Sequence, residues 1–302
     1  MKNYAKLVLV LAAMLAGTLN ASAQDKVEKF GLLNHFSVGL TVGTPGIGFD
    51  VATCVGEYVQ VRAGAQFFPS IGFSRSFTPT EIPKFKKAIN ALETLAKNTD
   101  YQFTVPSKTV DADAKIGFSS GKFLVDVFPF PKKSNFHVTV GFYFGGSDIV
   151  TLRNAKDGIL NDFLVPDYKG SNPAVKAKFD QIMAENKIVV GEPLFGLRIG
   201  DYQLKPDKNG NLQAGISVNK VRPYVGIGFG RAVPRKRIGF MVELGVQFWG
   251  TPNVYIEGGE GRKNLDEEDL SGIKGSDAGL IKTLSKLTIY PNLTFRLCGR
   301  IL

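Results

Sequence analysis

The chain of 302 residues has few of the residues that small secreted modules and metal sites depend on: two cysteines, two histidines and one tryptophan. Two cysteines exclude a disulfide-stapled module, which needs many more. The usual ligand spacings assemble no metal cluster from so few histidines and cysteines, and we expect no metal and no cofactor. Beyond the N-terminal segment no apolar run reaches the ~20 residues of a transmembrane helix, which excludes a helical membrane protein.

The N-terminal segment has the three parts of a secretory signal peptide. A basic head precedes an apolar run from Leu7 to Leu19, and Ala21-Ser22-Ala23 supplies small residues where a signal peptidase cleaves. The apolar run of ~13 residues is too short for a membrane-spanning helix. We therefore expect a signal peptide over 1–23, cleavage between Ala23 and Gln24, and one mature domain over 24–302.

Apolar residues alternate with polar or small ones along many segments, as in strands with one apolar face. The clearest segment runs from Ile238 to Phe248. Tight turns join several segments, and long excursions over 69–107, 146–193 and 250–285 separate the others. The pattern predicts about ten antiparallel strands, with eight or twelve as alternatives. The ten segments begin near His35, Gly46, Tyr58, Thr109, Lys122, Asn135, Leu197, Lys220, Arg237 and Lys286.

Alternation is shared by soluble barrels, which turn the apolar face inward, and membrane barrels, which turn it outward. Here the polar faces are rich in glycine, which suits a crowded lumen. Strands of ~9–12 residues match a tilted bilayer span. The chain also ends inside a strand, and closure against the first strand would remove both exposed edges. We expect an all-β fold, a transmembrane antiparallel up-and-down β-barrel with short helices in its long loops.

The segments Tyr224–Arg231 and Val246–Gly250 resemble the glycine-aromatic strands of the bacterial outer-membrane β-barrel superfamily, which is porin-like. The last ten residues are similar to the sorting strand that barrel-assembly machinery recognises, although such strands usually end in Phe rather than Leu. The residues that carry this likeness are Leu293, Phe295, Leu297, Ile301 and Leu302.

This resemblance implies a place in the outer membrane of a Gram-negative bacterium. It also implies that the assembly machinery, outer-membrane lipid and lipopolysaccharide are the partners. The formal net charge of +10 suits lipopolysaccharide phosphates, although scattered solvated lysines would give the same balance. We expect no nucleic-acid partner.

The faces opposite the apolar ones carry charges of both signs. Buried charges must pair, and a barrel of eight to ten strands has little room beyond its own side chains. We therefore expect a filled lumen crossed by salt bridges. The expected network contains Arg62, Asp111, Asp113, Lys115, Glu243 and Arg296, and Asp126, His137, Arg237 and Arg300 are also expected to face inward.

Two residue pairs have both a catalytic and a structural interpretation. Asp111 and Asp113 resemble the paired acids of the omptin proteases, but no Asp-x-His accompanies them. His35 and Ser37 resemble the His-x-Ser of outer-membrane lipid A deacylases, but no acid is placed to orient the imidazole. We favour structural roles for both pairs and expect no enzyme.

Helical periodicity appears in two excursions. One helix is expected from Thr80 as N-cap, and Asn172-Pro173 is expected to open another. Each helix could form a plug or lid, but we favour loop helices packed on the barrel rim. Cys54 and Cys298 should be free thiols, because two steps of ~4.8 Å across a sheet exceed the ~7 Å that a disulfide spans.

Three functions remain open from the sequence. The first is a non-enzymatic barrel with a structural, adhesive or surface-binding role. The second is a narrow channel for small solutes, and the third is a barrel-embedded hydrolase.

Overall fold

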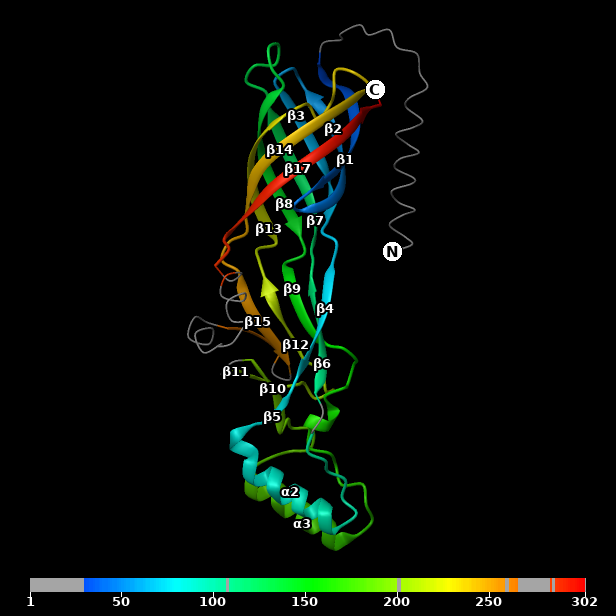
Figure 1. Ribbon diagram of the computed structural model, residues 1–302, viewed down its shortest axis with the longest axis vertical. Helices are drawn as coiled ribbons and strands as arrows, with labels where there is room; N and C mark the ends of the chain where they lie inside the picture. Colours follow the sequence, from blue (N-terminus) through cyan, green and yellow to red (C-terminus); the bar gives the residue numbers. More distant parts are fainter. Residues whose placement is uncertain are drawn as a thin grey trace.

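The computed structural model describes residues 30–106, 109–199, 202–258, 261–265, 283 and 286–301. The described chain is elongated, with a barrel at one end, an open sheet in the middle and two helices at the far end (Figure 1). Among the described residues no helix is long and apolar enough to span a membrane.

The barrel is closed and has eight strands. Each strand pairs antiparallel with the barrel strands that come before and after it along the chain. The first and last strands close it, with Gly39 opposite Cys298. The all-β antiparallel barrel is therefore confirmed. Its strands are β1 (Leu32–Gly43), β2 (Gly46–Val55), β3 (Val59–Phe67), β7 (Ser119–Val127), β8 (Phe136–Gly145), β13 (Val221–Phe229), β14 (Ile238–Phe248) and β17 (Ile289–Arg300).

The prediction of about ten barrel strands is wrong. The segments near Thr109 and Leu197 do form strands, β6 (Val110–Ile116) and β10 (Phe195–Ile199). Both belong to other sheets. The error has a physical cause, since a period-two pattern appears in any strand that buries one face, whichever sheet contains it.

A six-stranded sheet prolongs one side of the barrel wall. Five of its strands are joined to barrel strands by short connections: β4, β9 and β15 follow β3, β8 and β14, and β6 and β12 precede β7 and β13. The five keep the order of the barrel strands they continue. Each of these five barrel strands is therefore prolonged into the sheet beside the same neighbours that it has in the barrel. The sheet contains β4 (Ile71–Phe77), β6, β9 (Asp148–Asn154), β12 (Gln213–Ser217), β15 (Asn253–Gly258) and β16 (Gly261–Asn264).

The far end of this extension has its own apolar core, to which both helices contribute. Asn172 caps α3, where its side-chain oxygen accepts from the Ala174 N–H at 3.0 Å. Thr80 is not an N-cap but lies in a strand, and its hydroxyl donates to the Gly196 carbonyl. The elements are β5 (Pro79–Glu81), η2 (Pro83–Phe85), α2 (Lys86–Asn98), η3 (Asn161–Phe163), α3 (Pro173–Asn186), β10 and β11 (Tyr202–Leu204).

The prediction that the two helices pack on the barrel rim is wrong. They lie against each other at the end of the extension, with the six-stranded sheet between them and the barrel (Figure 1). Their apolar faces bury residues such as Ile89, Leu92 and Phe179, so the extension has a core that is separate from the barrel.

The polarity of the barrel wall is inverted relative to a soluble protein. Charged and polar side chains on the inner face are buried, among them Arg62 and Arg296 at 1% exposure. Apolar side chains on the outer face are exposed, such as Phe240 at 58% and Leu244 at 56%. The barrel therefore presents a continuous apolar belt outward, which we call the outer belt.

Candidate functional site

The lumen is crossed by an ion-pair network centred on Arg62. One of its guanidinium nitrogens, Nη2, lies 2.7 Å from Asp126 Oδ1 and 2.5 Å from Glu243 Oε2. The Thr139 hydroxyl is 2.8 Å from each of the same two oxygens and can donate to one at a time. Because β3 and β14 lie four places apart in a ring of eight strands, the Arg62–Glu243 pair joins opposite walls of the barrel.

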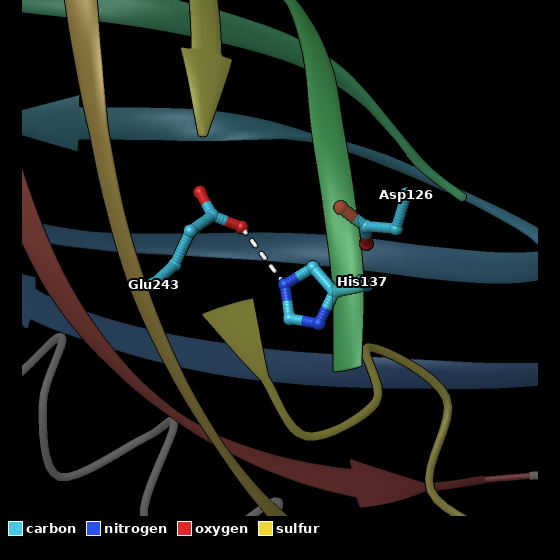
Figure 2. A group of neighbouring side chains, drawn as sticks. All are labelled: Asp126, His137 and Glu243. Atoms are coloured by element: carbon cyan, nitrogen blue, oxygen red, sulfur yellow. Dashed lines mark ion pairs between the residues drawn. The ribbon is translucent and has the colours of Figure 1, made fainter. Parts of the chain in front are cut away.

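Glu243 collects further partners from the neighbouring walls. Its Oε1 accepts a hydrogen bond from the Tyr224 hydroxyl at 2.7 Å. Figure 2 shows the His137 ring turned toward it, with Nε2 at 3.4 Å from Oε2. A carboxylate with this many donors stays charged while fully buried, since each donor offsets part of its desolvation cost.

A second network centres on Asp50. Its Oδ2 lies 2.9 Å from Lys122 Nζ, and its Oδ1 accepts from Arg296 Nε at 2.7 Å. A Cβ added at Gly39 would collide with the Arg296 guanidinium, so a glycine is needed there to make room. The three cations and three carboxylates of the two networks balance in charge, as a low-dielectric interior requires.

The turn between β13 and β14 folds into the lumen at the end where the chain terminates. We call Arg231–Pro234 the inner plug. Ala232 and Val233 are fully buried. The Ala232 carbonyl accepts from Arg296 Nη1 at 2.7 Å and from the Ser37 hydroxyl at 2.6 Å. Gln60 exchanges two hydrogen bonds with the Val233 backbone, at 3.0 and 3.2 Å.

The other end of the lumen is closed by aromatic rings. Trp249 stacks on Tyr290 with 4.5 Å between ring centroids, and Phe118 meets both edge-on. Phe68 stacks on Phe118. This aromatic mouth joins the apolar core at the base of the extension. Plug, ion pairs and aromatic rings therefore lie at successive levels along the lumen.

Three residues expected in the lumen lie outside it, and those predictions are wrong. Asp111, Asp113 and Lys115 lie on the exposed face of β6 in the extension. The two carboxylates there accept hydrogen bonds from the hydroxyls of Ser76 and Ser74 across the sheet, at 2.6 and 2.5 Å. The alternation correctly placed these three side chains on one face of the strand, but the strand belongs to an open sheet that encloses no lumen.

The other expected residues divide between the lumen and its rim. Arg62, Asp126, His137, Glu243 and Arg296 are buried inside the barrel. Arg237 and Arg300 are half-buried at the plug end, where Arg300 Nη1 donates to the Arg235 carbonyl at 2.9 Å. Sequence reasoning missed Asp50, Lys122 and the inner plug.

Asp126, His137 and Glu243 offer three possible metal-ligand atoms within 4.8 Å of one another. These residues do not fit a resident metal ion. The Arg62 guanidinium already lies between the two carboxylates, and a divalent cation there would add charge to a balanced interior. We assign the group to the ion-pair network.

The suggested catalytic pairs are not arranged for catalysis. The Ser37 hydroxyl, which a His-x-Ser site would use as its nucleophile, donates to the Ala232 carbonyl in the inner plug. The His35 ring packs edge-on against Phe30, 5.5 Å between centroids. Asp111 and Asp113 have no histidine beside them within the described part of β4, β6 and β9.

Both cysteines are free thiols and are buried, as predicted. On the last strand, Leu293, Phe295 and Leu297 point outward into the outer belt and Ile301 is exposed. The expected cleavage residues Ala23 and Gln24, and the terminal Leu302, lie outside the described residues.

The extension contains two cavities of opposite charge. One of about 580 Å³ lies between the segments after α2 and before α3 and is lined by Asp100, Asp162 and Asp167 with the rings of Tyr101 and Tyr168. Another of about 460 Å³ has lysine-rich walls to which all three excursions contribute.

No protein-family model and no curated protein matches the chain. Two crystal structures from Acinetobacter baumannii are similar to it. CarO is 15% identical with a TM-score of 0.39, and the match covers 89% of this chain and 99% of CarO. CarO2 is 13% identical with a TM-score of 0.39, and the match covers 88% of this chain and 98% of CarO2.

Proposed function

We propose that this chain is an outer-membrane protein whose filled barrel anchors a binding extension on the cell surface. One observation carries the proposal: the barrel buries its charges and exposes its apolar residues. Exposed apolar surface costs about 25 cal/mol per Å² in water, and so extensive a belt is unusual on a soluble monomer. A bilayer removes that cost, since lipid tails solvate the outer belt.

The ends of the barrel indicate its orientation. Bacterial membrane barrels have short periplasmic turns and longer external loops. Here the plug end has three turns and no excursion, whereas all three excursions leave from the other end, which also has the short β1–β2 turn. The extension would therefore face outward among lipopolysaccharide. Export by cleavage after Ala23 and recognition of the last strand by the assembly machinery belong to the same proposal.

A binding role is supported more strongly than transport or catalysis. Solutes would have to pass the inner plug, two ion-pair networks and the aromatic mouth in series. The residues considered for catalysis make structural contacts instead. The extension, in contrast, has two open cavities.

Two measurements test this proposal. The purified protein should produce no steady conductance in planar bilayers. An epitope tag inserted after Gly170, in the segment before α3, should be labelled on intact cells. The same tag inserted between Lys132 and Lys133 should be labelled only after permeabilisation. Steady conductance would favour the narrow channel, and reversed labelling would contradict the orientation.

A further inference from the structure

The lysine-rich cavity is formed where the three excursions meet. Its walls come from the end of η2, from the segment before β10, from the β11–β12 connection and from strands β15 and β16. Its volume of about 460 Å³ falls within the range of small-molecule sites. Such a cavity depends on the complete fold of the extension, because no single excursion encloses it.

The charges around the cavity are unequal: four lysines line it with two glutamates. Glu192 is already engaged, since its carboxylate lies 3.9 Å from Lys84 Nζ and accepts from the Val189 N–H at 3.2 Å. Lys205 and Lys208, in contrast, have no acidic partner within the described chain. The cavity therefore presents two ammonium groups without an ion pair in one connection, against one such carboxylate, Glu257, from β15.

The carboxylate closest in sequence does not neutralise these two lysines. Asp207 lies between them, but its Oδ1 accepts from the backbone N–H groups of Asn209 and Asn211 at 2.9 and 2.7 Å. Those bonds fix the turn that holds both lysines.

Another part of the cavity lining is apolar. Val189 and Val190 line the cavity, and their side chains are exposed at 64% and 48%. The buried side chains of Phe85, Leu204 and Leu212 complete this apolar lining. An occupant that covered the valines would remove apolar surface from water.

We propose that this cavity binds an anionic amphiphile: a phosphate or carboxylate group between Lys205 and Lys208, next to a short apolar portion against Val189 and Val190. The inference rests on the proposed surface-binding function and adds the chemical class of its ligand. The acidic cavity lined by Asp100, Asp162 and Asp167 provides a contrast within the same extension, since its charge repels such a ligand.

The test uses the full chain in nanodiscs of phosphatidylcholine and calorimetric titration with four probes: hexyl phosphate, hexanoate, inorganic phosphate and hexanol. Hexyl phosphate should bind about ten-fold more tightly than inorganic phosphate or hexanol, because only it engages both the lysines and the valines. Hexanoate distinguishes a carboxylate from a phosphate source, and binding by either amphiphile supports the inference.

Variants locate the site. Lys205→Gln with Lys208→Gln should weaken hexyl phosphate binding about ten-fold, and Val190→Ser should weaken it without affecting inorganic phosphate. Lys132→Gln with Lys133→Gln removes the same charge at the opposite end of the molecule and should change nothing. Equal binding by all variants, or equal affinity for hexanol, would overturn the inference. Surface labelling of the tag after Gly170 in the same variants reports the proposed function separately.

Discussion

Arg62 is the cation at the centre of one of the two lumen networks. It holds two buried carboxylates, Asp126 and Glu243, and no lysine or second arginine pairs with either in the described chain; the His137 ring lies 3.4 Å from Glu243. Arg62→Met should therefore leave two buried negative charges uncompensated. Removing one partner of a buried pair costs about 3–5 kcal/mol, and we expect a loss of unfolding free energy of that order in guanidinium titrations.

Lys97→Met is the matched control for Arg62→Met. It also removes a cation from an ion pair, with Glu93 at 2.9 Å, but the lysine is 70% exposed. Such surface pairs contribute about 0–1 kcal/mol. Equal losses for the two variants would show that the lumen network adds no more stability than a solvated pair.

Tyr101 makes the extension sensitive to alkali. Its hydroxyl donates to the Pro166 carbonyl at 3.0 Å, and burial together with the nearby Asp167 carboxylate raises the pKa of this tyrosine above its ordinary value. The unfolded chain ionises near pH ~10, so the stabilisation is complete below that pH and is lost as pH rises toward the folded pKa. Helical circular dichroism should fall above pH ~10, less steeply in Tyr101→Phe. An unchanged slope in the variant would assign the transition to another group.

At the scale of elements, the inner plug protects both thiols. Cys54 accepts from Gln60, the side chain that holds Val233, and Cys298 Sγ lies 3.5 Å from the Arg231 carbonyl. Buried thiols are inert. The folded protein should therefore show no reactive thiol and the denatured protein two. Gln60→Ala should expose Cys54 first, whereas Gln66→Ala, which removes a lumen amide nearer the other end, should expose neither. Rapid labelling of the unmodified folded protein would contradict the placement of the plug.

The sequence predicted the barrel walls because alternation shows that the two faces of a strand meet different environments. It did not predict which sheet a strand joins, so Asp111 and Asp113 on β6 looked the same as lumen residues. The alternation along β3 and β14 correctly placed Arg62 and Glu243 on the inner face. Their pairing across the lumen depends on strand number and closure, which no local pattern contains. The inner plug could have been predicted from Ala232 and Val233, because two consecutive apolar residues in a turn indicate that the turn is buried.

At the scale of the whole molecule, two cores stabilise two parts by different means. The barrel has polar networks inside and the outer belt outside, whereas the tip of the extension has an apolar core that includes Phe179 at 2% exposure. Only the extension contains α-helices among the described residues. Helical circular dichroism should therefore report unfolding of the extension, and the heat-dependent mobility of the protein in gels should report unfolding of the barrel.

We expect two unfolding transitions. Phe179→Ala removes a buried ring at a cost of about 3–5 kcal/mol and should lower the helical transition while the barrel keeps its folded mobility. Arg62→Met should lower the barrel transition and leave the helical transition unchanged. A single transition that both substitutions shift equally would mean that strand continuity from β3, β7, β8, β13 and β14 into the extension couples the parts into one cooperative unit. Separate shifts would mean that the extension can unfold or rearrange around a ligand while its anchor stays intact.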